Sequence, residues 1–201
     1  MSINMEEKPF CREELNNRLE RVNGWINNCD QKAGILLAFV GALAAVLITS
    51  NIVSAGYSYL VKPFYDYWLK DVDSAISVKK LLLIPLLIAV LWNVVKMVKY
   101  LVLVLRPKTI IADFKEEDSV ITKNSRLHFQ SIAGLKYNDF LHACQIQSNE
   151  SYLNDLCSQI YCNSKICNDK FENYKKGLHS FINMLIYCFI ELLFVLLFPQ
   201  I

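Results

Sequence analysis

The stretch that decides the fold is AGILLAFVGALAAVLITSNIV, residues 33–53, which holds 21 residues and no charged side chain. About 20 consecutive apolar residues suffice for a helix to cross the hydrocarbon core of a bilayer. The stretch lies too far from the N-terminus, and after too many acidic residues, to be a cleaved signal peptide. The sequence therefore predicts a complete transmembrane span.

Two further apolar blocks, residues 81–105 and 178–198, are as long as the first. Hydrophobic residues make up 54% of the 201-residue chain and charged ones 20%, where soluble domains average about 45–50% and about 25%. Buried helices of a soluble protein are the alternative, but three of this length in one short chain favour a membrane. We predict an all-α membrane protein with three transmembrane helices.

Lysine and arginine set the direction of the spans. Of the 21 basic residues, ten lie in residues 106–177 and five in the first 32, and none follows the third block. The positive-inside rule then places the N-terminus and residues 106–177 in the cytosol. Four lysines in residues 54–80 oppose this orientation without reversing it. We therefore expect a membrane protein with several spans and a cytosolic N-terminus.

The expected organisation follows from these spans. It comprises a cytosolic N-terminal helix (1–32), a first span (33–53), an external aromatic-rich segment (54–80), a second span (81–105), a cytosolic helical region (106–177) and a third span (178–198). The external aromatic side chains are typical of a belt at the lipid headgroups, with a carbohydrate or ligand platform as the alternative. They are Tyr57, Tyr59, Phe64, Tyr65, Tyr67 and Trp68.

Heptad spacing precedes both the first and the third span, and we call these two segments the stalk. Because both spans run from inside to outside, the segments should be parallel helices that zip together and continue into their spans. The first set of positions is Leu15, Leu19, Val22, Ile26, Cys29 and Ala33. The second set is Leu153, Cys157, Ile160, Ser164, Cys167, Phe171, Tyr174 and Leu178.

Between the second span and the second stalk segment, the sequence changes character. Pro107 should end the span, because proline cannot continue a helix, and the charged residues 113–125 are typical of a loop. Apolar residues then predict one or two short helices packed on the stalk. They are Leu127, Phe129, Ile132, Leu135, Tyr137, Phe140 and Leu141.

Signatures of catalysis and of nucleic-acid binding are missing from the sequence. It contains no phosphate-binding glycine loop, no H-E-x-x-H and no nucleophile elbow. Its net charge is +2, and it has no stripe of basic residues of the kind that binding to nucleic acid requires. Cys157, Cys162 and Cys167 are spaced by five, a rotation of about 140° on a helix, so they cannot share one metal ion. We expect no enzyme, no cofactor and no metal, and reduced thiols facing the cytosol.

Three small sets of residues are candidates for function. Polar residues gather where two stalk helices enter the membrane, at Asn28, Asp30, Lys32 and Lys170, and this cluster predicts either anchoring or an anionic-ligand site. Glu191 lies within the third span with Asn93 at similar depth, which indicates either bundle stabilisation or gating. A small-residue stripe on the first span permits close helix packing within one chain or between chains. It consists of Gly34, Ala38, Gly41, Ala42 and Ala45.

Four stretches, in order, resemble the transmembrane effectors of Pycsar bacterial anti-phage systems. The first is Asp30, Lys32, Ala33, Gly34, Leu37 and Ala38, and the second is Arg106-Pro107. The third is Phe129, Gln130, Ser131, Ile132 and Ala133, followed by Tyr137, Phe140 and Leu141. The fourth is Asp155, Leu156, Gln159, Ile160, Ser164, Lys165, Ile166, Lys170 and Phe171. Together they cover most of the chain, from about residue 23 to the third span.

This resemblance implies an effector rather than an enzyme. It implies a response to a cyclic nucleotide, with the pyrimidine type suspected, and an impairment of the inner membrane that kills or arrests the infected cell. The implied partners are that messenger, membrane lipid and further copies of the chain in a homo-oligomer. A membrane anchor or scaffold whose coiled-coil stalk docks a partner protein is the alternative function, and a membrane enzyme is a distant third.

Overall fold

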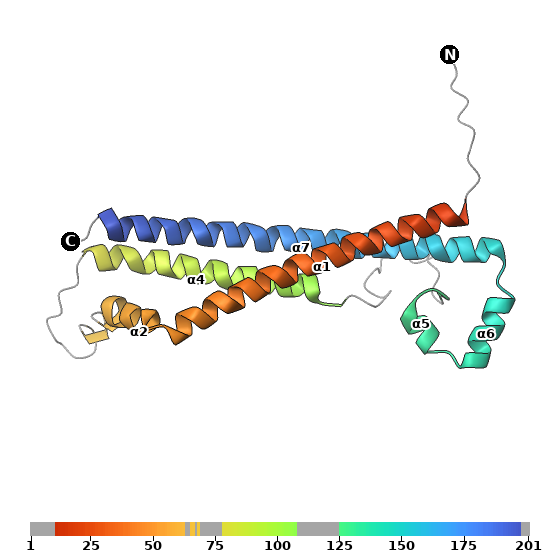
Figure 1. Cartoon of the computed structure of the whole chain (residues 1–201), viewed down its shortest axis with the longest axis horizontal. Coiled ribbons are helices and arrows are strands. Elements are labelled where there is room, and N and C mark those ends of the chain that lie inside the picture. Colours follow the sequence, from red (N-terminus) through yellow and green to blue (C-terminus); the bar gives the residue numbers. More distant parts are fainter. Residues whose placement is uncertain (1–10, 63–64, 67, 69–77, 108–124, 198–201) are drawn as a thin grey trace, which may run out of the picture. The chain divides into compact units, whose positions relative to one another are not determined.

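The computed structural model of this chain describes residues 11–62, 65–66, 68, 78–107 and 125–197. Within those ranges the secondary structure is helical, without a strand. In order, the elements are α1 (Arg12–Thr49), α2 (Ile52–Gly56), the π-helical turn η1 (Tyr57–Val61), α4 (Val78–Leu105), α5 (Phe129–Ala133), α6 (Tyr137–Gln145) and α7 (Asn149–Leu197) (Figure 1). Phe64, Tyr67 and residues 113–124 of the predicted loop lie outside the described residues.

Three helices are long and apolar enough to cross a membrane. They are α1 with 38 residues, residues Leu82–Leu105 of α4 with 24, and α7 with 49. The predicted all-α membrane fold with three spans is therefore confirmed. As expected, α4 ends at Leu105, directly before Arg106 and Pro107.

Helix α1 ends at Thr49. There the side-chain hydroxyl donates a hydrogen bond to a backbone carbonyl of the last turn, from Thr49 Oγ1 to Ala45 O at 2.8 Å.

The chain divides into two compact units, which we describe separately. The first comprises Met1–Asp30 and Arg106–Phe171, and the second comprises Gln31–Leu105 and Glu172–Ile201. The helices α1 and α7 each contribute residues to both units without a break in their helical structure.

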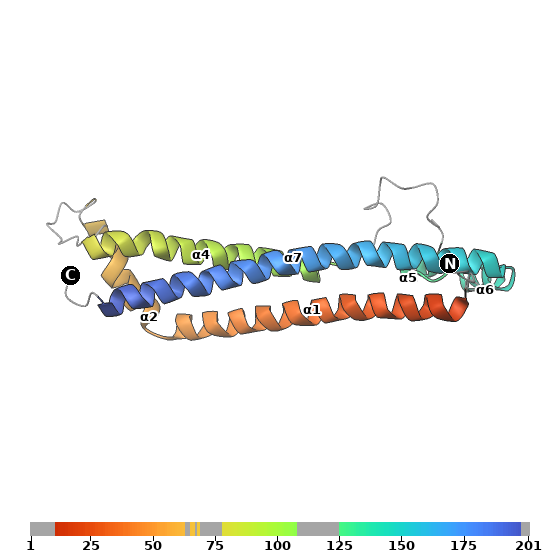
Figure 2. The same ribbon diagram turned by 90° about the horizontal axis from the view of Figure 1, so that it is seen from above.

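In the first unit, α1 and α7 run parallel and in register (Figure 2). The Asn163 amide donates to Asn23 and the Lys170 ammonium donates to Asp30, and both pairs join residues 140 positions apart. The guanidinium of Arg12 lies 4.3 Å from the ring centroid of Tyr152, and these two residues are also 140 positions apart in the sequence. A constant offset with both numbers rising is the signature of parallel helices, so the predicted parallel zipper is confirmed.

The two stalk helices differ in how well the heptads predicted their contact faces. On α1, the predicted positions are buried or half-buried, with Leu15, Val22, Cys29 and Ala33 the most enclosed. On α7 the predicted face is only partly right. The predicted positions other than Ser164 are buried or half-buried, but the most enclosed residues of α7 in the first unit are Asp155, Leu156, Ser158, Gln159, Cys162, Cys167 and Lys170, of which only Cys167 was predicted.

Ser164, which we had placed on that face, is exposed. The apolar pattern misled us because α7 buries polar side chains that have specific partners. Buried polar groups are stable when they are hydrogen-bonded or paired, so polarity alone does not exclude a position from a core.

The two short helices expected after the loop are present as α5 and α6, and their expected packing is only partly present. Neither helix has a buried residue. Phe129, Tyr137 and Ile146 are exposed by 62%, 74% and 64%. The expectation that the apolar side chains of this region pack on the stalk therefore holds only in part: Leu127, Ile132 and Phe140 are half-buried, and the other four predicted side chains are exposed.

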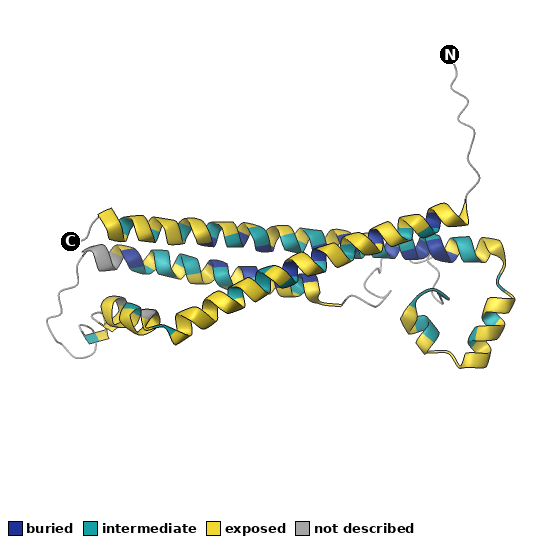
Figure 3. Ribbon diagram, in the orientation of Figure 1, coloured by how far each residue is buried: buried dark blue, intermediate teal, exposed yellow. Residues whose placement is uncertain are grey.

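In the second unit, α4 packs closely against α7. Met97, Leu101 and Val104 are fully buried. A Cβ added at Gly177 would lie 3.0 Å from Leu101 Cδ2, so glycine is what permits this close approach. Phe39 and Phe181 make an edge-to-face contact at 6.3 Å between ring centroids. Most other apolar side chains of this unit are exposed (Figure 3), which suits helices surrounded by lipid.

Candidate functional site

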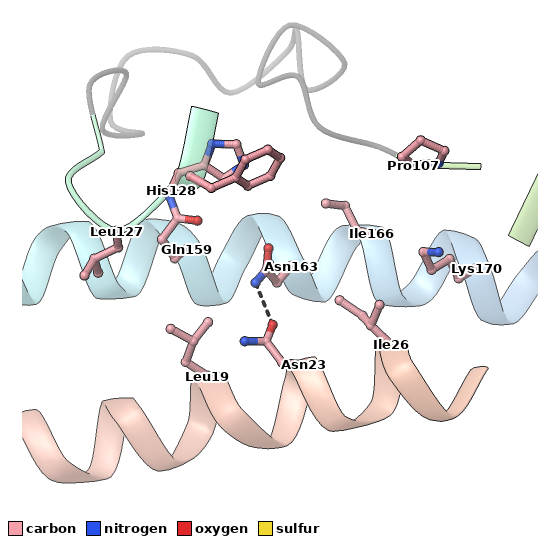
Figure 4. Close-up of a pocket in the computed structure, with 11 residues that line it drawn as sticks. Leu19, Asn23, Ile26, Pro107, Leu127, His128, Gln159, Asn163, Ile166 and Lys170 are labelled. Atoms are coloured by element: carbon pink, nitrogen blue, oxygen red, sulfur yellow. Dashed lines mark hydrogen bonds between the residues drawn. The ribbon is translucent and has the colours of Figure 1, made fainter. Parts of the chain in front are cut away.

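The first unit contains a groove of about 390 Å³ bounded by three walls (Figure 4). This volume falls in the range of roughly 300–1,000 Å³ that is usual for small-molecule sites. Helix α1 supplies one wall, α7 the second, and the segment before and at the start of α5 the third. The lining residues are Leu19, Asn23, Ile26, Pro107, Leu127, His128, Phe129, Gln159, Asn163, Ile166 and Lys170.

The middle of the groove carries an amide pair that joins its two helical walls. Asn163 Nδ2 donates to Asn23 Oδ1 at 2.8 Å (Figure 4). Each amide has one further hydrogen-bonding group, and Asn163 Oδ1 and Asn23 Nδ2 make no hydrogen bond to the described residues. The pair therefore offers one acceptor and one donor to a ligand.

At one end of the groove lies a buried cation. The ammonium group of Lys170 donates to Asp30 Oδ1 at 2.6 Å, and the two side chains are exposed by 7% and 34%. A lysine at this depth needs a partner, because burial of an unpaired charge is strongly unfavourable. The carboxylate of Asp30 is an ion-pair partner of Lys170 inside the unit.

The third wall is held in place from α7. Asp155 is 1% exposed, and its Oδ2 accepts a hydrogen bond from the backbone N–H of Arg126 at 2.8 Å. Ser125 is buried as well, and its hydroxyl oxygen accepts hydrogen bonds from the backbone N–H groups of Leu127 and His128. These contacts fix a tight turn. The turn presents His128 and Phe129 side by side, with their ring centroids 4.9 Å apart.

The structure brings together two of the four predicted ligand residues. Lys170 lines the groove, and Asp30 is its ion-pair partner. Asn28 is exposed on α1 and is not part of the groove lining. Lys32 is exposed and belongs to the second unit.

The other two candidate sets belong to the second unit. Asn93 is buried, and its amide nitrogen donates to the carbonyl of Ala89 at 2.8 Å within its own helix. Glu191 is half-buried on α7. In the small-residue stripe, a Cβ added at Gly34 or Gly41 would have no neighbour within 4 Å, and the alanines are exposed.

Comparison with known proteins identifies the family. The model of the Pycsar effector protein domain matches residues 14–198. A Pycsar effector protein from Gulbenkiania mobilis is 34% identical over 176 residues, which cover 85% of this chain and 86% of that protein. The chain belongs to the Pycsar effector family. The resemblance seen in the sequence is thereby confirmed. No solved structure matches the chain.

Cysteines near the stalk of this Pycsar effector are poor candidates for reactive groups. Burial raises the pKa of the Cys157, Cys162 and Cys167 thiols, and for Cys157 the charge of Arg18 opposes this only in part. Since the thiolate is the nucleophile and the metal ligand, a raised pKa lowers its population at neutral pH. A neutral thiol packs like a small apolar side chain, which accounts for the place of these cysteines in the stalk.

Sequence reasoning missed several residues that shape the groove in this Pycsar effector. It assigned no role to Asn23, Asn163 or Asp155, although Asp155 and Gln159 stood in the stretches that resemble the family. Neither segment alone marks these residues, because only the offset of 140 between the two helices places their polar residues opposite each other. Fixing that offset requires the contact itself, which the heptads alone do not give.

Proposed function

We propose that this Pycsar effector responds to a cyclic nucleotide, of the pyrimidine type, and then impairs the integrity of the bacterial inner membrane in anti-phage abortive infection. The observation that carries the proposal is the groove, which ends at a buried lysine in a family member with three candidate spans. A cyclic nucleotide has one anionic phosphodiester, and a lysine is a common phosphate ligand.

Helix continuity supports a route from ligand to membrane. Lys170 and Asp30 lie on α7 and α1, and both helices continue unbroken into apolar segments. A ligand changes a conformational equilibrium only as far as it binds one state better than the other. Ligand contact at Lys170 and Asp30 is therefore the proposal that the geometry favours, while Asn28 and Lys32 remain proposals from sequence and resemblance.

In the membrane, we propose roles for the two sets found in the second unit. Glu191 and Asn93 are proposed to act in gating, because ionisable and polar side chains within spans are costly unless they serve function or packing. The small-residue stripe is proposed as the surface on which further copies of the chain assemble. Three spans are too few helices to enclose a water-filled path, so a pore requires a homo-oligomer.

Membrane leakage tests this function directly. Cells that express the chain together with a uridylate or cytidylate cyclase are expected to take up propidium iodide within minutes of cyclase induction. Cells with an inactivated cyclase should exclude the dye. Glu191→Gln in the same assay should reduce uptake if the carboxyl group gates the path. Absence of uptake with cyclic UMP, CMP, AMP and GMP alike would contradict the proposed function.

Topology is a second expected result. A reporter fused after Ile201 should behave as external and one inserted near Lys123 as cytosolic, because of the distribution of lysine and arginine. Alkaline phosphatase, which is active outside, and green fluorescent protein, which fluoresces inside, give opposite readings at each site. Finding both sites on one side of the membrane contradicts the proposed orientation and requires an even number of spans between them.

The alternative, an anchor or scaffold that docks a partner protein, is favoured by one observation. Helices α5 and α6 expose apolar side chains outside the candidate spans, with Tyr137 and Ile146 the most exposed of α6 and its C-terminal flank. Such a role predicts no dye uptake with any cyclic nucleotide. The leakage assay therefore separates the two functions.

A further inference from the structure

The groove combines an amide pair, two neighbouring rings and a paired lysine, and these suit the parts of a mononucleotide. We propose that a single mononucleotide occupies the groove, that its phosphate takes Lys170 in exchange for Asp30, and that its base edge binds the Asn23–Asn163 pair. This inference rests on the proposed response to a cyclic nucleotide. It adds the position of the ligand, the residues that read the base, and the contact that the ligand breaks.

The charges at the end of the groove require the ligand's phosphate to replace the Asp30 carboxylate at Lys170. Lys170 is the lysine of the groove lining, and Asp30 already neutralises it at 2.6 Å. A phosphate added beside that pair would meet a carboxylate of the same sign within a few ångströms, where charges repel strongly. An anion therefore gains most when it replaces the carboxylate. Asp30 is one-third exposed, so it can turn towards water when it is displaced.

The amide pair can read one edge of a base. Asn163 Oδ1 can accept a hydrogen bond and Asn23 Nδ2 can donate one while the hydrogen bond between the two side chains is kept. The Watson–Crick edges of uracil and cytosine each place a donor next to an acceptor. The Asn23–Asn163 pair therefore complements a nucleobase, and a purely aliphatic ligand would leave both groups unused.

The spacing of the polar groups along α7 and the two aromatic rings of the third wall agree with this placement of the nucleotide. Asn163 and Lys170 are seven residues apart on α7, about 10 Å along the helix axis, which is close to the length of one mononucleotide. Phe129 and His128 lie on the wall opposite the helices and offer flat aromatic faces. Stacking on such faces is worth roughly 1–3 kcal/mol per base. One mononucleotide can thus place its base at the Asn23–Asn163 pair and its phosphate at Lys170 at the same time.

The exchange has a consequence for the stalk. The Lys170–Asp30 ion pair joins α7 to α1, so a phosphate that takes Lys170 removes that link. The ligand then binds more tightly to the conformation in which the ion pair is open. Occupancy of the groove therefore shifts the population of stalk conformations.

Affinity measurements on the full-length protein in lipid nanodiscs test the exchange. With cyclic UMP and cyclic CMP as probes in titration calorimetry, Lys170→Met should weaken binding at least tenfold, and Lys170→Arg should recover most of the loss. Asp30→Asn should strengthen binding several-fold, because asparagine still accepts the lysine hydrogen bond but no longer competes as a charge. A purely structural ion pair would make both Lys170→Met and Asp30→Asn weaken binding.

Further binding measurements test the base and the phosphate of the ligand separately. Asn163→Leu should weaken cyclic UMP about tenfold, because the base edge loses its partners, and uridine without phosphate should bind equally well to wild type and Lys170→Met. Lys165→Met is the matched control, since Lys165 is exposed on the same helix, over the ring of Tyr161, and is not part of the groove lining.

Outcomes distinguish this inference from the proposed function. If wild-type protein binds no cyclic nucleotide, both are overturned. If wild type binds and leaks dye but Asn163→Leu has unchanged affinity, or Asp30→Asn weakens binding as Lys170→Met does, the placement in the groove is wrong and the function stands. Thermal unfolding of each variant checks the fold, and a larger ligand-induced rise in Tm for Asp30→Asn than for wild type confirms the exchange independently.

Discussion

Cells that carry Ala38→Leu together with Ala42→Leu are expected to survive cyclase induction, with dye uptake no higher than in uninduced cells. Both alanines are exposed within the chain, and a Cβ added at the neighbouring Gly34 or Gly41 meets nothing within 4 Å. The added leucine atoms therefore do not clash with the chain's own side chains. Their effect must come from contacts with another molecule, where closely approaching helices need small residues.

The measurement combines dye uptake with cross-linking of membranes. The double variant should insert at normal levels, fail to leak, and give smaller cross-linked species than wild type. Ala44→Leu is the control, because Ala44 is also exposed but is turned by about 100° from Ala45 of the small-residue stripe. If the double variant keeps both its cross-linked species and its toxicity, the stripe contacts lipid only.

The second large effect is expected for Asp155→Ala in the first unit. This substitution removes the carboxylate that accepts from the Arg126 backbone at 2.8 Å and so holds the third wall of the groove. A hydrogen bond to a charged group contributes about 1.5–3 kcal/mol, and every 1.4 kcal/mol is about tenfold in an equilibrium. Detachment of the wall should rise at least tenfold. Affinity for cyclic UMP should fall by the factor by which the attached fraction falls.

Limited trypsin digestion measures the detachment, because release of the turn exposes the peptide bond after Arg126. Asp155→Asn should behave nearly as wild type, since its amide oxygen still accepts from Arg126 and the other carboxylate oxygen is buried without a hydrogen-bond partner. Asp139→Ala is the control for losing an exposed acid on α6. Unchanged cleavage at Arg126 in Asp155→Ala would show that the carboxylate does not hold the wall.

Much of the architecture was predictable because it depends on local chemistry. The uncharged run at residues 33–53 needs no partner to indicate a span, since its length and composition match the bilayer. Pro107 marks the end of α4 for a reason contained in the residue itself. The heptad of α1 indicated its buried face because Leu15 and Val22 are apolar and pack wherever an apolar surface meets them.

The candidate site was predictable only in part. Lys170 and Asp30 were chosen for their depth and for a resemblance, and the structure joins them. Asn23 and Asn163 gave no such signal, because each is an ordinary surface residue until the other stands opposite. The face of α7 was only partly predicted for the same reason, since Lys170 occupies a core position that an apolar pattern assigns to its neighbours.

The sequence by itself determined that this chain is helical, has three spans and carries two parallel stalk segments, because hydrophobic length and period are properties of single segments. Only the tertiary structure decided the offset of 140 between α1 and α7, the polar pairs that the offset creates, and the turn that Asp155 fixes against them. The physical reason is that a buried polar side chain is stable only with its partner. That partner lies far away along the chain, so the pairing is a property of two segments together.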